Sequence, residues 1–186
     1  MRLLSIFCYI CLGLLLLPLA SCANHSFTGN GNWVTQSRSV AKFDRINISG
    51  HFRLVYQDQQ PHALQVSADS NLLPYVQTTV KNGELLISTK PGAQLRSSKT
   101  ITLHLSSESL EQVTANGSNQ IKLSGLRERW LRVNASGGDR IALEGKVDEA
   151  VYDCHGAAKI DASKLSTIDT TVKMTGAGEV VAMAKQ

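Results

Sequence analysis

The chain has 186 residues, a formal net charge of +4, 18% charged residues and 5% aromatic residues. Such a weak and scattered positive charge argues against nucleic-acid binding, which needs a concentrated basic surface. Few aromatic residues and many Gly, Ser, Thr, Val and Ile favour strands and turns over helices, and the length suits one domain with its own core.

The first 21 residues have the pattern of a signal peptide. Arg2 supplies a positive start, residues 3–17 are apolar, and the segment ends in small residues. The order LASC, ending at Cys22, resembles the lipobox of bacterial lipoproteins, which implies lipidation of Cys22 as the first mature residue. The residue after the cysteine is Ala23, and in the lipoproteins that this order resembles the lack of Asp at that position goes with transfer to the outer membrane. We therefore expect a lipid-anchored protein of the bacterial cell envelope, on its periplasmic or its surface face; a plain secreted protein and a single membrane span are the alternatives.

Residues 22–41 are predicted to be the lipidated N-terminus and a flexible tether, because they are polar, glycine-rich and without periodicity. Residues 42–186 then form the head domain. Alternating apolar residues predict strands near 46–48, 52–56, 64–68, 76–80, 85–87 and 101–105. Gly50 predicts a turn, Asn82-Gly83 a hairpin or tight turn, and residues 91–99 an exposed loop.

A sequence repeat occurs four times between Val113 and Ala184: VTANGSNQIKLSG, VNASGGDRIALEG, YDCHGAAKIDASK and VKMTGAGEVVAMA. The central glycines lie 20, 19 and 20 residues apart, and an aliphatic residue follows each by four positions. These glycines are Gly117, Gly137, Gly156 and Gly176.

A repeat of about 20 residues that alternates apolar and polar positions is typical of one coil of a β-solenoid. We therefore predict an all-β, single-stranded parallel β-helix whose columns of equivalent apolar residues face inward. An antiparallel sandwich would also show short alternating strands, and it is the alternative fold. Cys154 is the cysteine left after Cys8 and Cys11 leave with the leader and Cys22 is lipidated. It shares its column with Ala115, Ala135 and Met174, so we expect a buried core residue.

Residues 43–182 resemble the auto-transporter adhesin head domain, also called the head GIN domain, a family of unknown function found in bacterial lipoproteins. The resemblance rests on FDRINISGHFRLVY, on VKNGELLIS and on the glycine-centred repeats. It implies a right-handed parallel β-helix and supplies no catalytic residue.

The search for a chemical site gives no catalytic, cofactor-binding or metal-binding residue. The histidines are scattered without metal-ligand spacing. Asp139, Asp161, Glu144 and Asp153 lie in the repeats, but the column of Asp139 also holds Asn119, Ala158 and Gly178, so no carboxylate ladder of the kind found in calcium-dependent β-helix lyases results.

The polar column before the turn glycines holds Asn116, Ser136, His155 and Thr175. It could form a ligand ridge, but such side chains more often bind turn backbone.

We predict a non-catalytic envelope lipoprotein that displays a β-helical domain for binding or adhesion, with a protein or a glycan as ligand. A structural envelope protein without an external ligand and a β-helix carbohydrate-active enzyme are the alternatives. The last coil, ending in VVAMA, has no amphipathic segment to cover it, so we expect its edge to meet a second copy or another protein.

Overall fold

Alternation of apolar and polar residues extends over most of the chain, and the computed structural model, which describes residues 25–58 and 61–183, is accordingly built from strands. The predicted all-β class is confirmed. None of the described helical turns is long and apolar enough to span a bilayer. The elements are β1 (His25–Thr28), β2 (Trp33–Ser37), β3 (Arg45–Gly50), β4 (Arg53–Asp58), β5 (Ala63–Asp69), the 3-10 turn η1 (Leu73–Tyr75), β6 (Val76–Lys81), β7 (Glu84–Thr89), β8 (Ala93–Arg96), β9 (Thr102–Ser107), β10 (Gln112–Gly117), β11 (Gln120–Gly137), β12 (Arg140–Gly156), β13 (Lys159–Gly176) and β14 (Glu179–Ala182).

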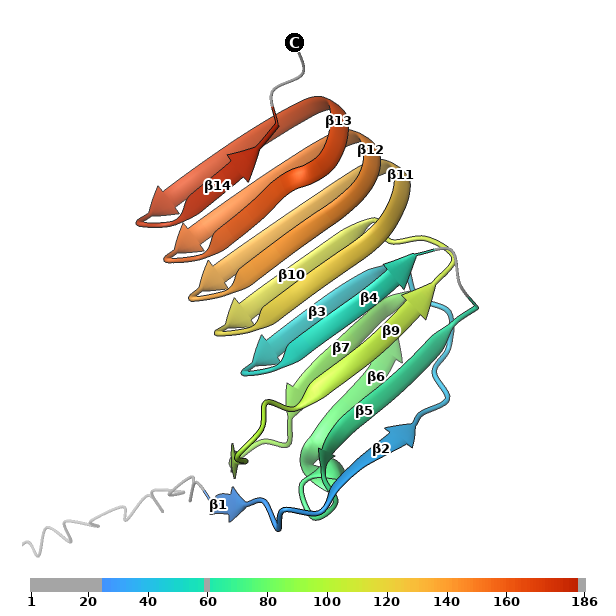
Figure 1. The fold of residues 1–186 in the computed structure, drawn as a ribbon, viewed down its shortest axis with the longest axis vertical. Helices are drawn as coiled ribbons and strands as arrows, with labels where there is room; N and C mark the ends of the chain where they lie inside the picture. Colours follow the sequence, from blue (N-terminus) through green and yellow to red (C-terminus); the bar gives the residue numbers. More distant parts are fainter. Residues whose placement is uncertain (1–24, 59–60, 184–186) are drawn as a thin grey trace, which may run out of the picture.

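The four repeats lie on top of one another. Strands β10 to β14 pair in parallel with a register of one repeat, so that Val113 faces Val133 and Gly117 faces Gly137. In Figure 1 the glycine turns line up along the left edge of this stack and the wider bends along the right edge. Repeats of the same residue type at the same phase therefore become columns across neighbouring strands.

Each level of the stack has two faces. The first residues of β11 pair with β4, whereas its last residues pair with β10, because the strand bends near Gly125, where φ is +74°. Strands β12 and β13 follow the same course. One face thus contains the residues that precede the glycine turns and the other face contains the residues that follow them.

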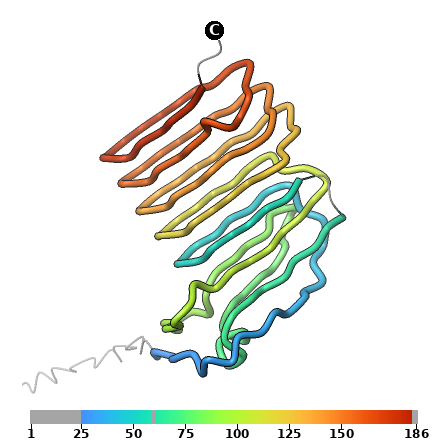
Figure 2. Tube along the Cα trace, in the orientation of Figure 1, coloured from blue at the N-terminus to red at the C-terminus, as the bar shows by residue number. Residues whose placement is uncertain are grey.

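Strands β3 and β4 form one further level of the same kind, with Gly50 as its turn. Strand β3 pairs in parallel with β10 and β7, and β4 pairs in parallel with β11 and β9. The level of β3 and β4 therefore lies between that of β7 and β9 and that of β10 and β11, out of chain order (Figure 2).

The N-terminal end of the stack is antiparallel. Strand β6 pairs with β7, β5 with β9, and β2 with β5, all in the antiparallel sense. The prediction of a single-stranded parallel β-helix over the whole head domain is therefore wrong for this end. The reason lies in the connections: β6 and β7 are joined by Asn82-Gly83, with φ values of 50° and 77°, and a two-residue turn of this kind reverses the chain. The predicted hairpin at Asn82-Gly83 is confirmed.

The N-terminal segment is also more ordered than its composition predicts. Residues 25–28 form β1, which pairs with β8, and residues 33–37 form β2, which pairs with β5. The expectation of a flexible tether is therefore wrong for these residues, and the predicted loop at 91–99 contains β8. The side chain of Arg38 fixes the segment further by donating to the carbonyl oxygens of Leu73 and Val76. Residues 1–24, with the predicted signal peptide and Cys22, lie outside the described residues.

The core is one continuous cluster between the two faces. Its buried apolar residues run from Phe43 to Leu165, and Cys154 is among them, as predicted. Burial raises the pKa of the Cys154 thiol, with a further contribution from the nearby Asp153 carboxylate, so that this cysteine is a poor nucleophile. The predicted inward residues of the last level differ, since Val172 and Met174 are 43% and 45% exposed.

Candidate functional site: a groove across five levels

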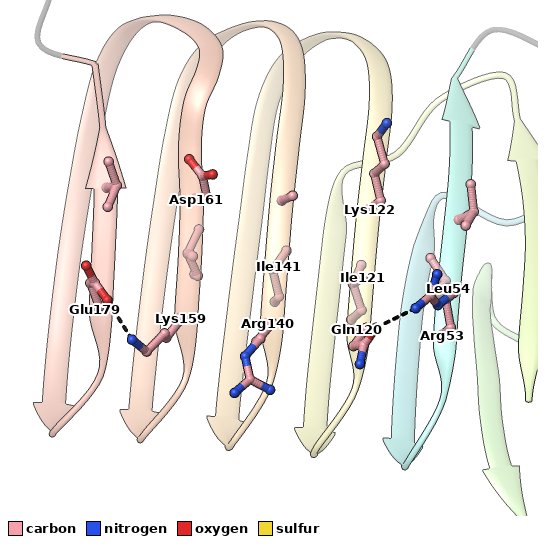
Figure 3. A pocket seen from close by; sticks show the side chains of 14 residues that line it. Arg53, Leu54, Gln120, Ile121, Lys122, Arg140, Ile141, Lys159, Asp161 and Glu179 are labelled. Carbon is pink, nitrogen blue, oxygen red and sulfur yellow. Dashed lines mark hydrogen bonds and ion pairs between the residues drawn. The ribbon is translucent and has the colours of Figure 1, made fainter. Parts of the chain in front are cut away.

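A groove of about 540 Å³ crosses the outer face formed by β4, β11, β12, β13 and β14. Figure 3 shows the outward side chains in successive rows, one row from each strand. The rows are about 4.8 Å apart, because this is the distance between paired strands, so the five levels span on the order of 19 Å. The lining side chains are Arg53, Val55, Gln120, Lys122, Arg140, Ala142, Lys159, Asp161, Glu179 and Val181, above the inward-facing Leu54, Ile121, Ile141 and Ile160.

One column of the groove consists of long polar side chains, three residues after each turn glycine. Within it Arg53 donates to Gln120 at 3.0 Å, and Lys159 lies 2.9 Å from Glu179 (Figure 3). Between these two pairs lies Arg140, an exposed residue whose guanidinium makes no hydrogen bond or ion pair to any other described residue. Its guanidinium is therefore available to a ligand.

The second column of the groove is two residues further along each strand. It holds Val55, Lys122, Ala142, Asp161 and Val181 in register. The small side chain of Ala142 leaves the groove open between the neighbouring charged rows. A smaller hollow of about 90 Å³ continues the groove past Ala142 toward Glu144 and Lys164.

The electrostatics of the groove favour anions. Four cationic side chains and two carboxylates line it, and one of the carboxylates is paired with Lys159. The other, Asp161, accepts a hydrogen bond from the backbone N–H of Ser163 at 3.0 Å. The hydroxyl and N–H of Ser163 lower the pKa of Asp161, so this carboxyl is ionised at neutral pH.

The ionisable groups whose pKa is raised are not among the residues that line the groove. Burial raises the pKa of Asp139, whose Oδ1 accepts from the backbone and side-chain amides of Asn119 at 2.7 and 2.8 Å. Asn119 Oδ1 in turn accepts from the backbone N–H of Phe52 at 3.1 Å. Asp139 is thus a structural link between levels, not a surface carboxylate.

A second buried network ties β4 to its neighbours. The Tyr56 hydroxyl donates to Asp58 Oδ1 at 2.9 Å and lies 2.7 Å from the Ser107 hydroxyl. The other oxygen of Asp58 accepts from the backbone N–H of Arg127 at 3.0 Å. Burial raises the pKa of Tyr56, so this hydroxyl stays a donor at neutral pH.

The residues singled out in the sequence are distributed as follows. The column before the turn glycines is in register, and its Ser136 hydroxyl donates to Asn116 Oδ1 at 2.6 Å, so these two side chains bind each other. His155 is exposed and lies 3.1 Å from Asp153. Within residues 25–58 and 61–183 no three His, Cys, Asp or Glu side chains are grouped to hold a metal ion.

Sequence reasoning missed the groove, although a signal for it was present. A long polar residue follows every turn glycine by three positions, from Arg53 to Glu179. The repeat places these residues in one column, but the alternation alone did not reveal that the outer face of the column is hollowed.

The chain belongs to the family described as "Putative auto-transporter adhesin, head GIN domain", whose model matches residues 42–186. No curated protein matches the chain.

Solved structures share its fold. A "putative adhesin" from Parabacteroides merdae has 20% identity and a TM-score of 0.58, with 83% of this chain and 82% of that chain covered. A second "putative adhesin", from Parabacteroides distasonis, has 21% identity and a TM-score of 0.57, with 84% of each chain covered. A "putative lipid binding protein" from the same species has 20% identity and a TM-score of 0.55, with 87% and 86% covered.

Proposed function

We propose that this protein is a non-catalytic, adhesin-like binding domain that holds an extended anionic polysaccharide along the groove of β4, β11, β12, β13 and β14. The observation that carries the proposal is the alignment of cationic side chains in rows about 4.8 Å apart. An extended polymer with a similar repeat distance could place one charged unit at each of the four rows from β4 to β13, which carry Arg53, Lys122, Arg140 and Lys159. Arg140 and Lys122 would be its central contacts, because neither is engaged by a described ion pair.

The carboxylates of the groove favour binding over hydrolysis. Glycoside hydrolysis uses two carboxyl groups, one of which has a raised pKa and protonates the leaving group. Here Asp161 has a lowered pKa, and Glu179 is held by Lys159. The family and the similar structures are also named for adhesion or lipid binding rather than for an enzymatic reaction.

The binding test uses residues 23–186, which contain the entire buried core. Calorimetric titration with acidic and neutral polysaccharides should give binding to the acidic ones, and Lys122→Ala with Arg140→Ala should weaken it by about tenfold or more. The control is Arg129→Ala with Lys146→Ala, which removes the same charge from exposed positions outside the groove. An equal loss in the control, or no binding to any acidic polysaccharide, would contradict the proposal.

We also propose that the domain is anchored in the bacterial outer membrane through a lipid on Cys22. The support is the lipobox-like sequence and the adhesin description of the family. Two or three acyl chains hold a protein stably on a membrane, whereas a single chain does so only marginally. Wild-type protein should fractionate with membranes and lose its domain when intact cells are treated with protease, whereas Cys22→Ala should not be anchored. Protection in intact cells would place the protein on the inner side and favour a structural envelope role.

The stack from β10 to β14 is, in our proposal, a right-handed β-solenoid of four repeats. The parallel register, which advances by one repeat at each level, supports the solenoid. Its right hand is what the resemblance of residues 43–182 to the head GIN domain implies. A crystal structure of residues 23–186 would test the handedness directly.

A further inference from the structure

The last level of the stack exposes side chains that every level below it buries. Val172 and Met174 are 43% and 45% exposed, whereas Tyr152 and Cys154, their partners in register on β12, are 0% and 2% exposed. The columns that end at Val172 and Met174 therefore lack only a further level that would bury these two side chains. Three further large apolar side chains are exposed at this end: Ile168, Val181 and Met183.

The same end has two open strand edges, one on each face. The second half of β13 pairs with β12 on one side, β14 pairs with β13 on one side, and no described strand lies beyond either (Figure 1). Open edges carry unpaired backbone N–H and C=O groups, which are templates for another strand. Whatever covers this end must satisfy two edges and the apolar columns between them.

The opposite end shows how this fold closes such a pair of edges. There β6 lies antiparallel on β7 and ends that face, whereas β5 lies antiparallel on β9 and β2 lies antiparallel beyond β5. The apolar residues beneath them, such as Leu85 and Leu103, are completely buried. Antiparallel strands thus cover a parallel level of this chain on both faces, with β6 alone on one face and β5 followed by β2 on the other.

We propose that the C-terminal end binds a second copy of this chain, end to end, about a two-fold axis. A two-fold axis across the stack reverses strand direction at the contact, so the second copy offers two antiparallel strands. The two edge strands of the second copy are as far apart as those of the first copy, because in both copies they are β13 and β14. Such a contact is isologous and closes at the dimer. This inference goes beyond the proposed function and does not depend on ligand binding.

Sedimentation velocity of residues 23–186, from low to several hundred micromolar, tests the proposal. The expected result is a monomer–dimer equilibrium. Amide hydrogen exchange on the same samples should show protection of residues 170–183 that increases with concentration. A monomer throughout this range, or concentration-dependent protection confined to another segment, would overturn the proposal.

A pair of variants locates the contact. Val172→Lys with Met174→Lys places charges in the exposed ends of the columns and should weaken dimerisation by about tenfold or more. Thr79→Lys, at an exposed position of β6 on the closed end, should leave the equilibrium unchanged. Circular dichroism and urea unfolding check that the variants are folded. If the exchange result stands while both variants dimerise like wild type, the assigned contact is wrong.

Discussion

The N-terminal end of the stack is covered by the antiparallel strands β5 and β6, whereas at the C-terminal end no described strand lies beyond β13 and β14. Both ends are built from the same kind of parallel level, with the same alternation of inward apolar residues. The burial of these residues nevertheless differs, from 0% exposure at Leu85 to 43% at Val172. The stability of a level therefore depends on having a neighbour on both sides, and less on the residues within it.

The largest expected difference between interior and end concerns the turn glycines. A Cβ at Gly117, where φ is +126°, would lie 2.3 Å from the carbonyl oxygen of Gly50, and one at Gly176 would lie 2.6 Å from that of Gly156. Gly117→Ala should cost more than about 3 kcal/mol of unfolding free energy, because levels on both sides prevent relief. Gly176→Ala should cost less, since the last level can move outward. Urea unfolding measures both; equal costs would mean that the end is as constrained as the interior.

Two valines at equivalent positions show how much of the stabilisation by a side chain depends on its burial. Val133 and Val172 occupy the same column, but the first is 0% exposed and the second 43%. Val133→Ala should cost about 2 kcal/mol through lost burial and a cavity, and Val172→Ala less than about 1 kcal/mol. Unfolding at low protein concentration gives these values. A cost at Val172 that increases with concentration would instead report covering of the end.

The two buried tyrosines, Tyr56 and Tyr152, differ in the hydrogen bonding of their hydroxyl groups. The Tyr56 hydroxyl has two buried partners, whereas the buried hydroxyl of Tyr152, whose pKa burial raises to about 12, has no hydrogen-bond partner in the described structure. Tyr56→Phe should cost about 1–3 kcal/mol. Tyr152→Phe should be neutral or slightly stabilising, because it removes an unsatisfied group. Thermal or urea unfolding distinguishes them, and a similar loss in both would show that Tyr152 has a partner such as water.

The smallest expected effect is a pH dependence. Burial raises the pKa of Asp139 above its ordinary 3.8, so the native state binds this proton more strongly than the unfolded state. The contribution of Asp139 is complete below that ordinary value and is lost as the pH rises through the raised value. Asp139→Asn should therefore lose less stability than wild type as the pH rises above about 4.

A control for this pH dependence is Asp161→Asn. The pKa of Asp161 is lowered, so its contribution is present above the ordinary value and is lost as the pH falls through the lowered one. The two substitutions should change the pH profile of unfolding in opposite directions. A profile that neither substitution alters would refute the assignment of these shifts.

The sequence predicted those parts of the fold that depend on local periodicity. The strands around Ile46, Leu54 and Leu103, the turn at Asn82-Gly83 and the equal phase of the repeats were readable, because alternation and turn chemistry act over a few residues. The strands β1 and β2 were not, because they are only four and five residues long and are held by partners more than thirty residues away in the chain, as in the pairing of Trp33 with Asp69. Cys22 and the leader are predictions that the described residues do not test.

Residues at fixed short separations set the all-β class, the spacing of the glycine turns and the columns of equivalent side chains, so these features could be predicted without a structure. Three features became apparent only in the folded chain: the β3–β4 level lies between β7–β9 and β10–β11, antiparallel strands cover one end, and a groove crosses the outer face. The physical reason is that backbone hydrogen bonds do not distinguish residue types. Which strand lies beside which is therefore decided by the packing of the whole core.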